Sequence, residues 1–551
     1  MFIKSNLVLQ ATAGLEPQQW HSINWSACWR KIKSLQRRIV KAIQSGNWRK
    51  VKRLYYLLTH SFSARALAVK RVTENSGKRT AGIDRELWKT PKSKVKAIET
   101  IVYWQQYQPK PLRRIHIPKK NGKKRPLSIP CMEDRARQAL HLQALLPITE
   151  TFADNNSYGF RPKRGCADAL SQCFKVLYHK GASQWVLEAD IKGFFDNIDF
   201  RWLVENIPMN QKVLKAWLHS GYVEKGNLFP SLKGVPQGGI ISPALGNKVL
   251  DGLESLINGS SRFQKANKIH FVRYADDFIV TASNKEALEG VIMPKINHFL
   301  AQRGVALSPE KTKITHISDG FDFLGQTIRK HKTEKGLGKL QVTPSKNSLK
   351  RIKTKINAVC KTSSGLSQKA LIERLNPILR GWANYHRHSI CSKAFSEVDT
   401  YVWTRVFRWG RRRHPNKTGQ WIGNRYFTHR PKKRWTFEDK RTGKQLIRIA
   451  RYFKFQRHIK VKAQANPFDA EWDDYFKQRN QKQVKKSSFG LRAKILKHCC
   501  WRCWVCWQPI QSDDELDLHH IDEDHLNNKL DNLQLLHPNC HRQLHHRYYS
   551  N

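Results

Sequence analysis

The sequence predicts a multidomain α+β protein, and three observations support this fold class. A chain of 551 residues is long enough for about two to five domains, each with its own hydrophobic core. Helix-like stretches that interleave basic and apolar residues open the chain and return after residue 344. Between them, strand-like runs such as WVLEAD, HFVRYADDFIVTA and FDFLGQTI alternate with helical pieces and with Gly and Pro.

These changes in composition divide the chain into four regions. Residues 1–110 are basic and helical, and residues 111–343 mix strands and helices. Residues 344–490 are helical at first and then very basic, and residues 491–551 are rich in Cys and His.

The charge of the chain predicts a polyanionic partner. There are 100 Lys and Arg residues against 43 Asp and Glu, for a formal net charge of +57. With 40% hydrophobic residues the chain has ample apolar surface to bury, which excludes a disordered basic tail. No apolar run approaches the ~20 residues of a membrane span, so we expect no membrane protein. Lys and Arg interleaved with Trp, Tyr and His favour nucleic acid, since aromatic and guanidinium planes stack on unpaired bases.

The cysteines do not form a disulfide pattern. Six of the eleven are scattered, and the other five lie between residues 499 and 540 among many histidines. This clustering is typical of metal binding in a reducing compartment. The N-terminus has neither the apolar core of a secretory signal nor an Arg-rich presequence, so we expect a cytoplasmic protein.

Paired carboxylates mark the most informative segment, IHFVRYADDFIVTAS. Two apolar β-rich runs flank a short turn with Asp276 and Asp277, which predicts a hairpin that presents both carboxylates at its tip. Upstream, Asp190 ends another apolar strand. Carboxylates at strand ends, backed by a hydrophobic sheet, suit a two-metal phosphoryl-transfer site with two Mg²⁺ ions. The alternative, ordinary turn residues, is favoured for Asp190 taken alone.

Two pairs of soft ligands predict a zinc site near the C-terminus. Cys503 and Cys506 have C-x-x-C spacing, and His537 and Cys540 repeat it as H-x-x-C. Four such ligands form a closed tetrahedral Zn²⁺ site, which would stabilise a module too small for much of a core. Cys499 and Cys500 are rivals for the first pair, but their spacing to Cys503 fits less well.

A second set of polar residues remains in the same module. His519 and His520 end an apolar strand-like piece, Asn532 follows, and His541 and His545 share one helical face at i, i+4. The alternative is one structural zinc finger that uses all these residues. That reading leaves more ligands than one zinc can use.

Ordered sequence blocks resemble the reverse transcriptases of the group II intron maturase family. They cover about residues 60–330 in the family order and read RIHIPKKNGKKRPLSIP, SYGFRPKRGCADAL, VLEADIKGFFDNI, GVPQGGIISPALGN, RYADDFIV, LSPEKTKI and FDFLG. The segments LNPILRGWANYH and WGRRRHPNK resemble the thumb or maturase (X) region of that family. The resemblance implies a basic helical extension over 1–60, then a right-hand fold with fingers and palm over 61–343 and a thumb over 344–430, and a separate C-terminal module over 491–551. By family order alone, 431–490 would be a DNA-binding region.

The resemblance also implies roles for individual residues. Asp190, Asp276 and Asp277 match the family's metal-binding triad, and the carbonyl of Ile191 would complete the coordination. Phe195 matches the residue that packs under the sugar and excludes a 2′ hydroxyl; the alternative is a core Phe.

Three further positions match residues around the incoming nucleotide. Lys119 and Arg125 correspond to residues that grip the triphosphate, and Arg suits this role because its fork donates two hydrogen bonds; the alternative for Lys119 is a solvated turn. Gln237 would hydrogen-bond near the nascent base pair, while adjacent glycines let backbone approach the template. Lys311 is a candidate phosphate contact. Ser128 stands where the family pattern leads us to expect Gly.

The C-terminal residues resemble the HNH, or ββα-metal, nuclease family. This resemblance implies that His520 is the general base that activates water and that Asn532 orients it. It also implies that His519, His541 and His545 hold one catalytic divalent ion, while the zinc stays structural.

Together these resemblances imply a multifunctional protein. It would bind its intron RNA, assist splicing, nick target DNA with the HNH module, and copy the RNA from the new 3′ end with deoxynucleoside triphosphates. Two alternatives are a free-standing reverse transcriptase with no intron partner and a splicing-only, RNA-binding maturase. The fused maturase-like segment and HNH module argue against the first, and the filled catalytic positions argue against the second.

Overall fold

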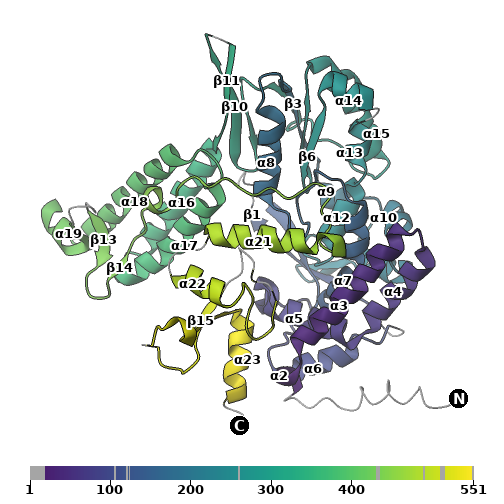
Figure 1. Ribbon diagram of the computed structural model, residues 1–551, viewed down its shortest axis with the longest axis horizontal. Coiled ribbons are helices and arrows are strands. Elements are labelled where there is room, and N and C mark those ends of the chain that lie inside the picture. The colour runs from purple at the N-terminus through teal and green to yellow at the C-terminus, as the bar shows by residue number, and fades with distance from the viewer. Residues whose placement is uncertain are drawn as a thin grey trace.

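The computed structural model describes residues 19–548 except 105–106, 119–121, 123, 259–260, 335, 430–434, 488–490, 509, 511–515 and 526. Helical and mixed α/β units surround a central sheet, and a small C-terminal module lies against the N-terminal helices (Figure 1). This arrangement confirms the multidomain α/β class. Within the described residues, no helix is long and apolar enough to cross a membrane.

The N-terminal helices form one packed unit with the long helix α7. Their buried side chains make a continuous core that runs from Trp20 to Ile148, so the boundary expected at residue 60 falls inside this core. Asn24, Asn47 and Ser61 cap three of the helices by accepting hydrogen bonds from first-turn amides. The bounds are α2 Gln19–Ser22, α3 Trp25–Gln44, α4 Trp48–His60, α5 Phe62–Glu74, η1 Ser76–Arg79, α6 Pro91–Thr100 and α7 Met132–Phe152.

A four-stranded antiparallel sheet occupies the centre, in the order β6-β7-β3-β8. One of its faces packs into the largest hydrophobic core, and helix α8 covers part of the other. The strands are β3 Trp185–Asp190, β6 His270–Tyr274, β7 Asp277–Ala282 and β8 Lys313–His316. The helices around the sheet are α8 Cys166–Leu177, α9 Phe194–Asn197, α10 Phe200–Asn206, α11 Gln211–Leu218, α12 Ser242–Leu250, α13 Leu253–Asn258, α14 Ser261–Asn267, the π-helical turn η2 Ala287–Ile292 and α15 Met293–Ala301.

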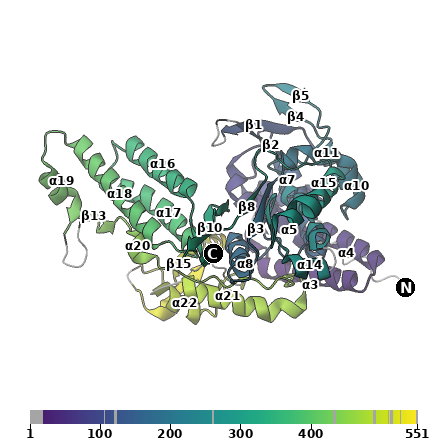
Figure 2. The same ribbon diagram turned by 90° about the horizontal axis from the view of Figure 1, so that it is seen from above.

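A second sheet, in the order β2-β1-β4-β5, projects above the helices (Figure 2). β1 and β2 form the expected basic hairpin, and β4 extends it by parallel pairing. The strands are β1 Leu112–Pro118, β2 Lys124–Ile129, β4 Tyr222–Glu224 and β5 Asn227–Phe229.

The segment FDFLGQTI is not one strand, as the sequence suggested, but two. β9 Phe321–Phe323 and β10 Gln326–Thr333 pair antiparallel, and β11 Gly336–Pro344 completes this sheet. The turn between the first two strands is formed by Leu324 and Gly325, both at positive φ. The side-chain pattern could not show this reversal, because the Leu is compatible with a continuous strand.

The helical unit after residue 345 has its own core. Helices α16 Lys346–Thr362, α17 Gln368–His386 and α18 Ser392–Arg413 pack together around it. Phe437, Leu446 and Ile449, from the region expected to start a separate unit at residue 431, also belong to this core. The smaller elements are α19 Gly419–Tyr426, β12 Phe427–Thr428, β13 Thr436–Asp439, β14 Lys444–Gln445 and α20 Ile449–Tyr452.

The rest of that region returns to the central sheet. We call residues 453–466 the strap; it runs without regular structure from the helical unit to helix α8, where Val461 and Ala465 enter the core. The segment 431–490 is therefore divided between two cores. The elements after the strap are the 3₁₀ turn η3 Ala470–Trp472 and α21 Asp473–Ser487.

The C-terminal module has a β-hairpin followed by a helix, as expected for a ββα unit. Its small core contains Cys503, Cys506 and Cys540 together with aliphatic side chains. Its elements are α22 Leu491–His498, β15 Asp517–His520, η4 Leu530–Asn532, β16 Leu533–Leu536 and α23 Pro538–Tyr548.

Candidate functional site

The three expected carboxylates meet at one edge of the central sheet. β6 and β7 form the predicted hairpin, in which Tyr274 pairs with Asp277, and the turn uses Ala275 at φ +59°. On the other side of β7, Asp277 is in direct register with Asp190 at the end of β3. Directly opposed residues on neighbouring strands bring their Cβ atoms to within about 5 Å. The sheet therefore places Asp190 beside the hairpin tip.

Mutual repulsion and burial perturb these carboxylates. Burial, followed by the charges of Asp276 and Asp190, raises the pKa of Asp277 to about 7. Burial and the charge of Asp190 also raise the pKa of Asp276. Several acids forced together in this way favour a cation between them, because a bound cation would remove the repulsion. The donor set, hard carboxylate oxygens, suits Mg²⁺.

Lys311 and Ile191 complete the surroundings of Asp190. The Lys311 ammonium donates a hydrogen bond of 2.7 Å to Asp190 Oδ2, so this lysine contacts a carboxylate rather than lying free for phosphate. Ile191 forms an antiparallel bridge with Leu307. The two hydrogen bonds of this bridge join the residues directly before and after Ile191 and Leu307, and not these two residues themselves. The Ile191 carbonyl is thus directed away from that bridge.

The expected nucleotide contacts fall on three elements. Arg125 is exposed on β2, and its charge offsets part of the rise in the pKa of Asp276. Phe195 lies in α9, and its ring packs over Gly246. The ring fits there because glycine has no side chain: a Cβ at position 246 would lie 2.9 Å from the Phe195 ring. Lys119 lies outside the described residues.

Gln237 belongs to a loop held from several sides. Its side chain donates to Asp196 Oδ1 at 3.0 Å, and its carbonyl accepts from the Ser128 amide at 2.7 Å. The next residue, Gly238, has φ +124°, and a Cβ there would lie 2.5 Å from the Ser128 carbonyl oxygen. Gln138 of α7 accepts from the Ile240 amide at 2.9 Å. These contacts fix the loop; the sequence identified Gln237 but gave no signal for Gln138 or Asp196.

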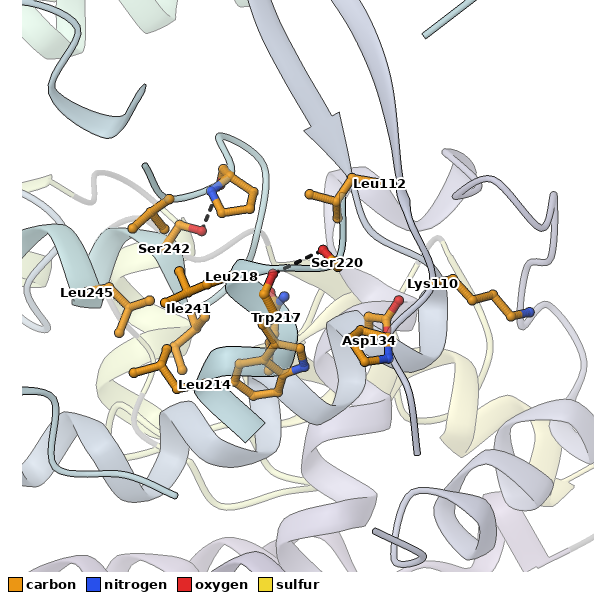
Figure 3. Close-up of a pocket in the computed structure, with 14 residues that line it drawn as sticks. Lys110, Leu112, Asp134, Leu214, Trp217, Leu218, Ser220, Ile241, Ser242 and Leu245 are labelled. Carbon is orange, nitrogen blue, oxygen red and sulfur yellow. Dashed lines mark hydrogen bonds between the residues drawn. The ribbon is translucent and has the colours of Figure 1, made fainter. Parts of the chain in front are cut away.

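A small cavity of about 20 Å³ lies beneath this loop (Figure 3). Asp134 lines it opposite Ser242 and Ile241, and burial raises the Asp134 pKa to about 6. One of its carboxylate oxygens accepts from Tyr107, and the other is buried without a hydrogen bond to the described residues. A cavity of this size holds one water molecule, which would satisfy that oxygen.

Arg273, a residue for which the sequence suggested no role, joins the carboxylate hairpin to neighbouring elements. Its side chain is fully buried and donates to Asp251 at 2.6 Å and to Asn247 at 3.3 Å. Its carbonyl accepts from the Tyr158 amide at 2.9 Å. The hairpin is therefore anchored to α12 and to the loop before α8.

The C-terminal module brings both predicted ligand sets together. Ligand atoms of Cys503, Cys506, His537 and Cys540 all lie within 4.8 Å of one another, and so do those of His519, His541 and His545. Hydrogen bonds from Cys506 and Cys540 strongly lower the pKa of Cys503, so a thiolate forms readily there. Three thiols and one imidazole suit Zn²⁺. The rivals Cys499 and Cys500 stay outside this group: Cys499 donates to the Ile495 carbonyl, and Cys500 is exposed.

The histidine group has a different chemistry. Burial and the neighbouring rings lower the pKa of His519, which keeps this imidazole neutral and able to bind a metal. The His541 and His545 rings approach to 3.0 Å between their Nε2 atoms. Asp517 Oδ2 lies 3.3 Å from His541 Nδ1, a carboxylate contact that fixes ring orientation and that sequence spacing did not reveal.

His520 ends strand β15, and Asn532 ends the turn η4 directly before strand β16. The His520 ring is buried, and its Nε2 has no hydrogen-bond partner among the described residues. The Asn532 side chain donates to Asp522 and to the Asn527 carbonyl. The main-chain carbonyl of Asn532 accepts from the Ile521 amide. Asn532 therefore fixes the turn that follows His520 rather than the His520 ring.

Comparisons with protein families match the chain in four consecutive segments. These are the N-terminal domain of reverse transcriptase at 20–101, reverse transcriptase (RNA-dependent DNA polymerase) at 117–328, the group II intron maturase-specific domain at 349–427 and HNH endonuclease at 503–547. The chain thus combines segments that match a reverse transcriptase domain, a maturase-specific domain and an HNH endonuclease domain.

Individual proteins share this similarity. Protein YkfC of Escherichia coli is 29% identical over 345 residues, which cover 55% of this chain and 90% of YkfC. Group II intron-encoded protein LtrA of Lactococcus lactis is 31% identical over 329 residues, which cover 48% of this chain and 54% of LtrA. The match thus spans about half of LtrA. The chain is thus similar to a group II intron-encoded protein over this match, and it also contains a maturase-specific domain.

A solved structure of telomerase from Candida albicans with a fragment of telomeric RNA is also similar. The similarity covers 59% of this chain and 65% of the telomerase chain, at 12% sequence identity and with a TM-score of 0.30. This likeness is too weak to bear on the fold.

Proposed function

We propose that the protein performs target-primed reverse transcription of its own intron RNA. The central sheet with its flanking helices would be the palm, the β1–β2 hairpin and N-terminal helices the fingers, and α16 to α18 the thumb. In the palm, Asp190, Asp276 and Asp277 would hold two Mg²⁺ ions with the Ile191 carbonyl. Bound there, the ions would supply charge stabilisation for attack of a primer 3′ oxygen on a nucleoside triphosphate.

The surrounding residues would place the nucleotide. Arg125, close to Asp276, would grip the triphosphate with Lys119. Phe195, packed over Gly246, would bring its ring against the sugar and so select deoxynucleotides. Gln237, held by Asp196 and Ser128, would present a fixed hydrogen-bonding group to the nascent pair.

The C-terminal module would nick the DNA strand that supplies the primer. Cys503, Cys506, His537 and Cys540 would hold a structural Zn²⁺, and His519, His541 and His545 a divalent ion that stabilises charge on the scissile phosphate. His520, whose buried Nε2 has no hydrogen-bond partner in the described part of the chain, would take the proton from the attacking water. Asn532 would keep the turn after His520 in place.

Exposed basic and aromatic side chains would bind the intron RNA and the target DNA. In the region 431–490, Tyr452, Lys454, Phe455 and Arg457 are all exposed, a composition suited to unpaired bases and phosphates. Described cysteines are all free thiols, in agreement with a reducing compartment, and we place the protein in the cytoplasm.

The observation that supports this proposal is the grouping of candidate residues at two places: three carboxylates at one edge of the central sheet and three histidines in the C-terminal module. A test is an assay with the RNA-loaded protein and a labelled DNA target. Asp276→Ala should abolish cDNA synthesis while RNA binding and nicking persist. His520→Ala should abolish nicking, and extension of a supplied DNA primer should continue. Extension by the first variant, or nicking by the second, would place the chemistry elsewhere.

A further inference from the structure

Two exposed tryptophans stand on the turn that carries the first cysteine pair of the C-terminal module. Trp504 and Trp507 are 54% and 55% exposed, and their rings stack at 5.8 Å between centroids with 28° between planes. Trp501, only a few residues earlier, packs instead against the module's core. The module thus covers part of one indole and leaves two others presented to solvent side by side.

The exposed pair is held in place by its backbone. The Trp507 amide donates to the Cys503 carbonyl at 2.8 Å, and the Cys503 amide donates to the Gln508 carbonyl at 3.0 Å. The Arg502 guanidinium donates to the Trp507 carbonyl at 2.8 Å. Trp507 adopts φ +57°, a conformation that a bulky residue takes only where surrounding contacts enforce it. The backbone that carries the two rings is therefore fixed.

The charge around the pair indicates what binds it. From residue 491 to residue 508 the chain contains four basic residues, no acidic one and a histidine. Arg492, Lys494 and Lys497 are exposed on α22. A ligand that complements both features is flat, aromatic and anionic. Nucleobases with their phosphates have these properties, and a base offers its face to an indole only when it is unpaired or unstacked.

We propose that Trp504 and Trp507 form a stacking site for an unpaired base of the DNA strand that this module cuts. This inference rests on the nuclease role proposed above and adds a substrate requirement to it. The indoles hold a base that is out of the duplex, and the neighbouring cations hold its phosphates. The module then prefers a target that is locally single-stranded.

The experiment uses the full-length protein and a 20-nucleotide single-stranded DNA with one 5-iododeoxyuridine. Irradiation joins this base to a stacked aromatic ring, and mass spectrometry of tryptic peptides locates the cross-link. We expect a cross-linked peptide that starts at Cys503, after the cleavable Arg502. Trp504→Ala with Trp507→Ala should reduce this product at least tenfold, since stacking contributes about 1–3 kcal/mol per base. Trp504→Phe with Trp507→Phe should retain most of it.

Two controls separate the possible outcomes. Zinc content of each variant reports whether the module still folds, and Trp48→Ala removes an exposed, stacked indole elsewhere in the chain. The proposal is overturned if the folded double alanine variant cross-links as the parent does, or if no cross-link maps to this turn. Failure of the parent protein to nick any DNA would instead refute the nuclease function, whatever the cross-link shows.

Discussion

Asp168 joins the strap to the central unit, and its replacement gives a quantitative prediction. This buried carboxylate on α8 accepts from His458 Nε2 at 2.9 Å, the Val461 amide at 2.7 Å and Arg479 at 2.8 Å. Arg479 is itself buried and also donates to the Ile459 carbonyl. Asp168→Ala would leave the Arg479 charge buried without its partner, which costs roughly 3–5 kcal/mol.

Hydrogen exchange measured by mass spectrometry tests this value. A loss of about 3 kcal/mol in local stability corresponds to roughly a hundredfold faster exchange, at about 1.4 kcal/mol per factor of ten. We expect this acceleration in peptides that contain Gln456 and Val461, while peptides from α16 exchange as before. Asp168→Asn, which keeps an acceptor, should have a smaller effect. Unchanged exchange in the strap of the alanine variant would refute the reasoning.

The same contact has a defined pH dependence. Burial alone would raise the Asp168 pKa, but the hydrogen bond from His458 and the charge of Arg479 outweigh it and lower the pKa below its usual value. A carboxyl with a lowered native pKa stabilises the fold above its unfolded pKa of about 3.9. The strap should therefore stay packed against α8 near neutral pH and separate from it as the pH falls below about 4.

Three other substitutions have distinct expected results. Gln138→Leu removes the acceptor of the Ile240 amide, so the loop of Gln237 should loosen. The KM for nucleotide, measured by single-nucleotide incorporation, should therefore rise. An unchanged KM would show that the loop is held without Gln138. Cys540→Ser should abolish zinc binding, measured by atomic absorption, and leave primer extension within about twofold; a parallel loss of extension would mean that the module supports the polymerase fold. Lys311→Met should leave the melting temperature nearly unchanged, because exposed ion pairs contribute about 0–1 kcal/mol. It should also lower the Mg²⁺ concentration for half-maximal extension, since the lysine no longer competes for Asp190, and a rise would contradict this competition.

Sequence patterns predicted the parts of the site that depend on local order. The carboxylate hairpin followed from two β-rich runs around a short turn, and the Cys/His group followed from residue spacing. The histidine group was implied by the family resemblance. Contacts between distant segments left no such pattern. Asp168 and Arg479 are 311 positions apart, and neither has a signature that predicts its partner. The region 431–490 was assigned by family order alone, which gave no sign of the apolar residues that divide it between two cores.

The support of the Gln237 loop illustrates the same limit. Ser128 stands where Gly was expected, but it is the backbone of Ser128 that contacts the loop. The Ser128 amide donates to the Gln237 carbonyl, and the Ser128 carbonyl lies against Gly238. A side-chain pattern carries no information on backbone hydrogen bonds between distant segments. The structure was therefore needed to find Gln138 and Asp196.

The most direct test of the central claim is to purify the protein from its native cell and sequence the RNA that accompanies it. An intron-encoded protein should carry one dominant, structured RNA that contains this reading frame. A broad mixture of cellular RNAs would contradict the intron partnership and would leave a free-standing reverse transcriptase as the account of the polymerase site.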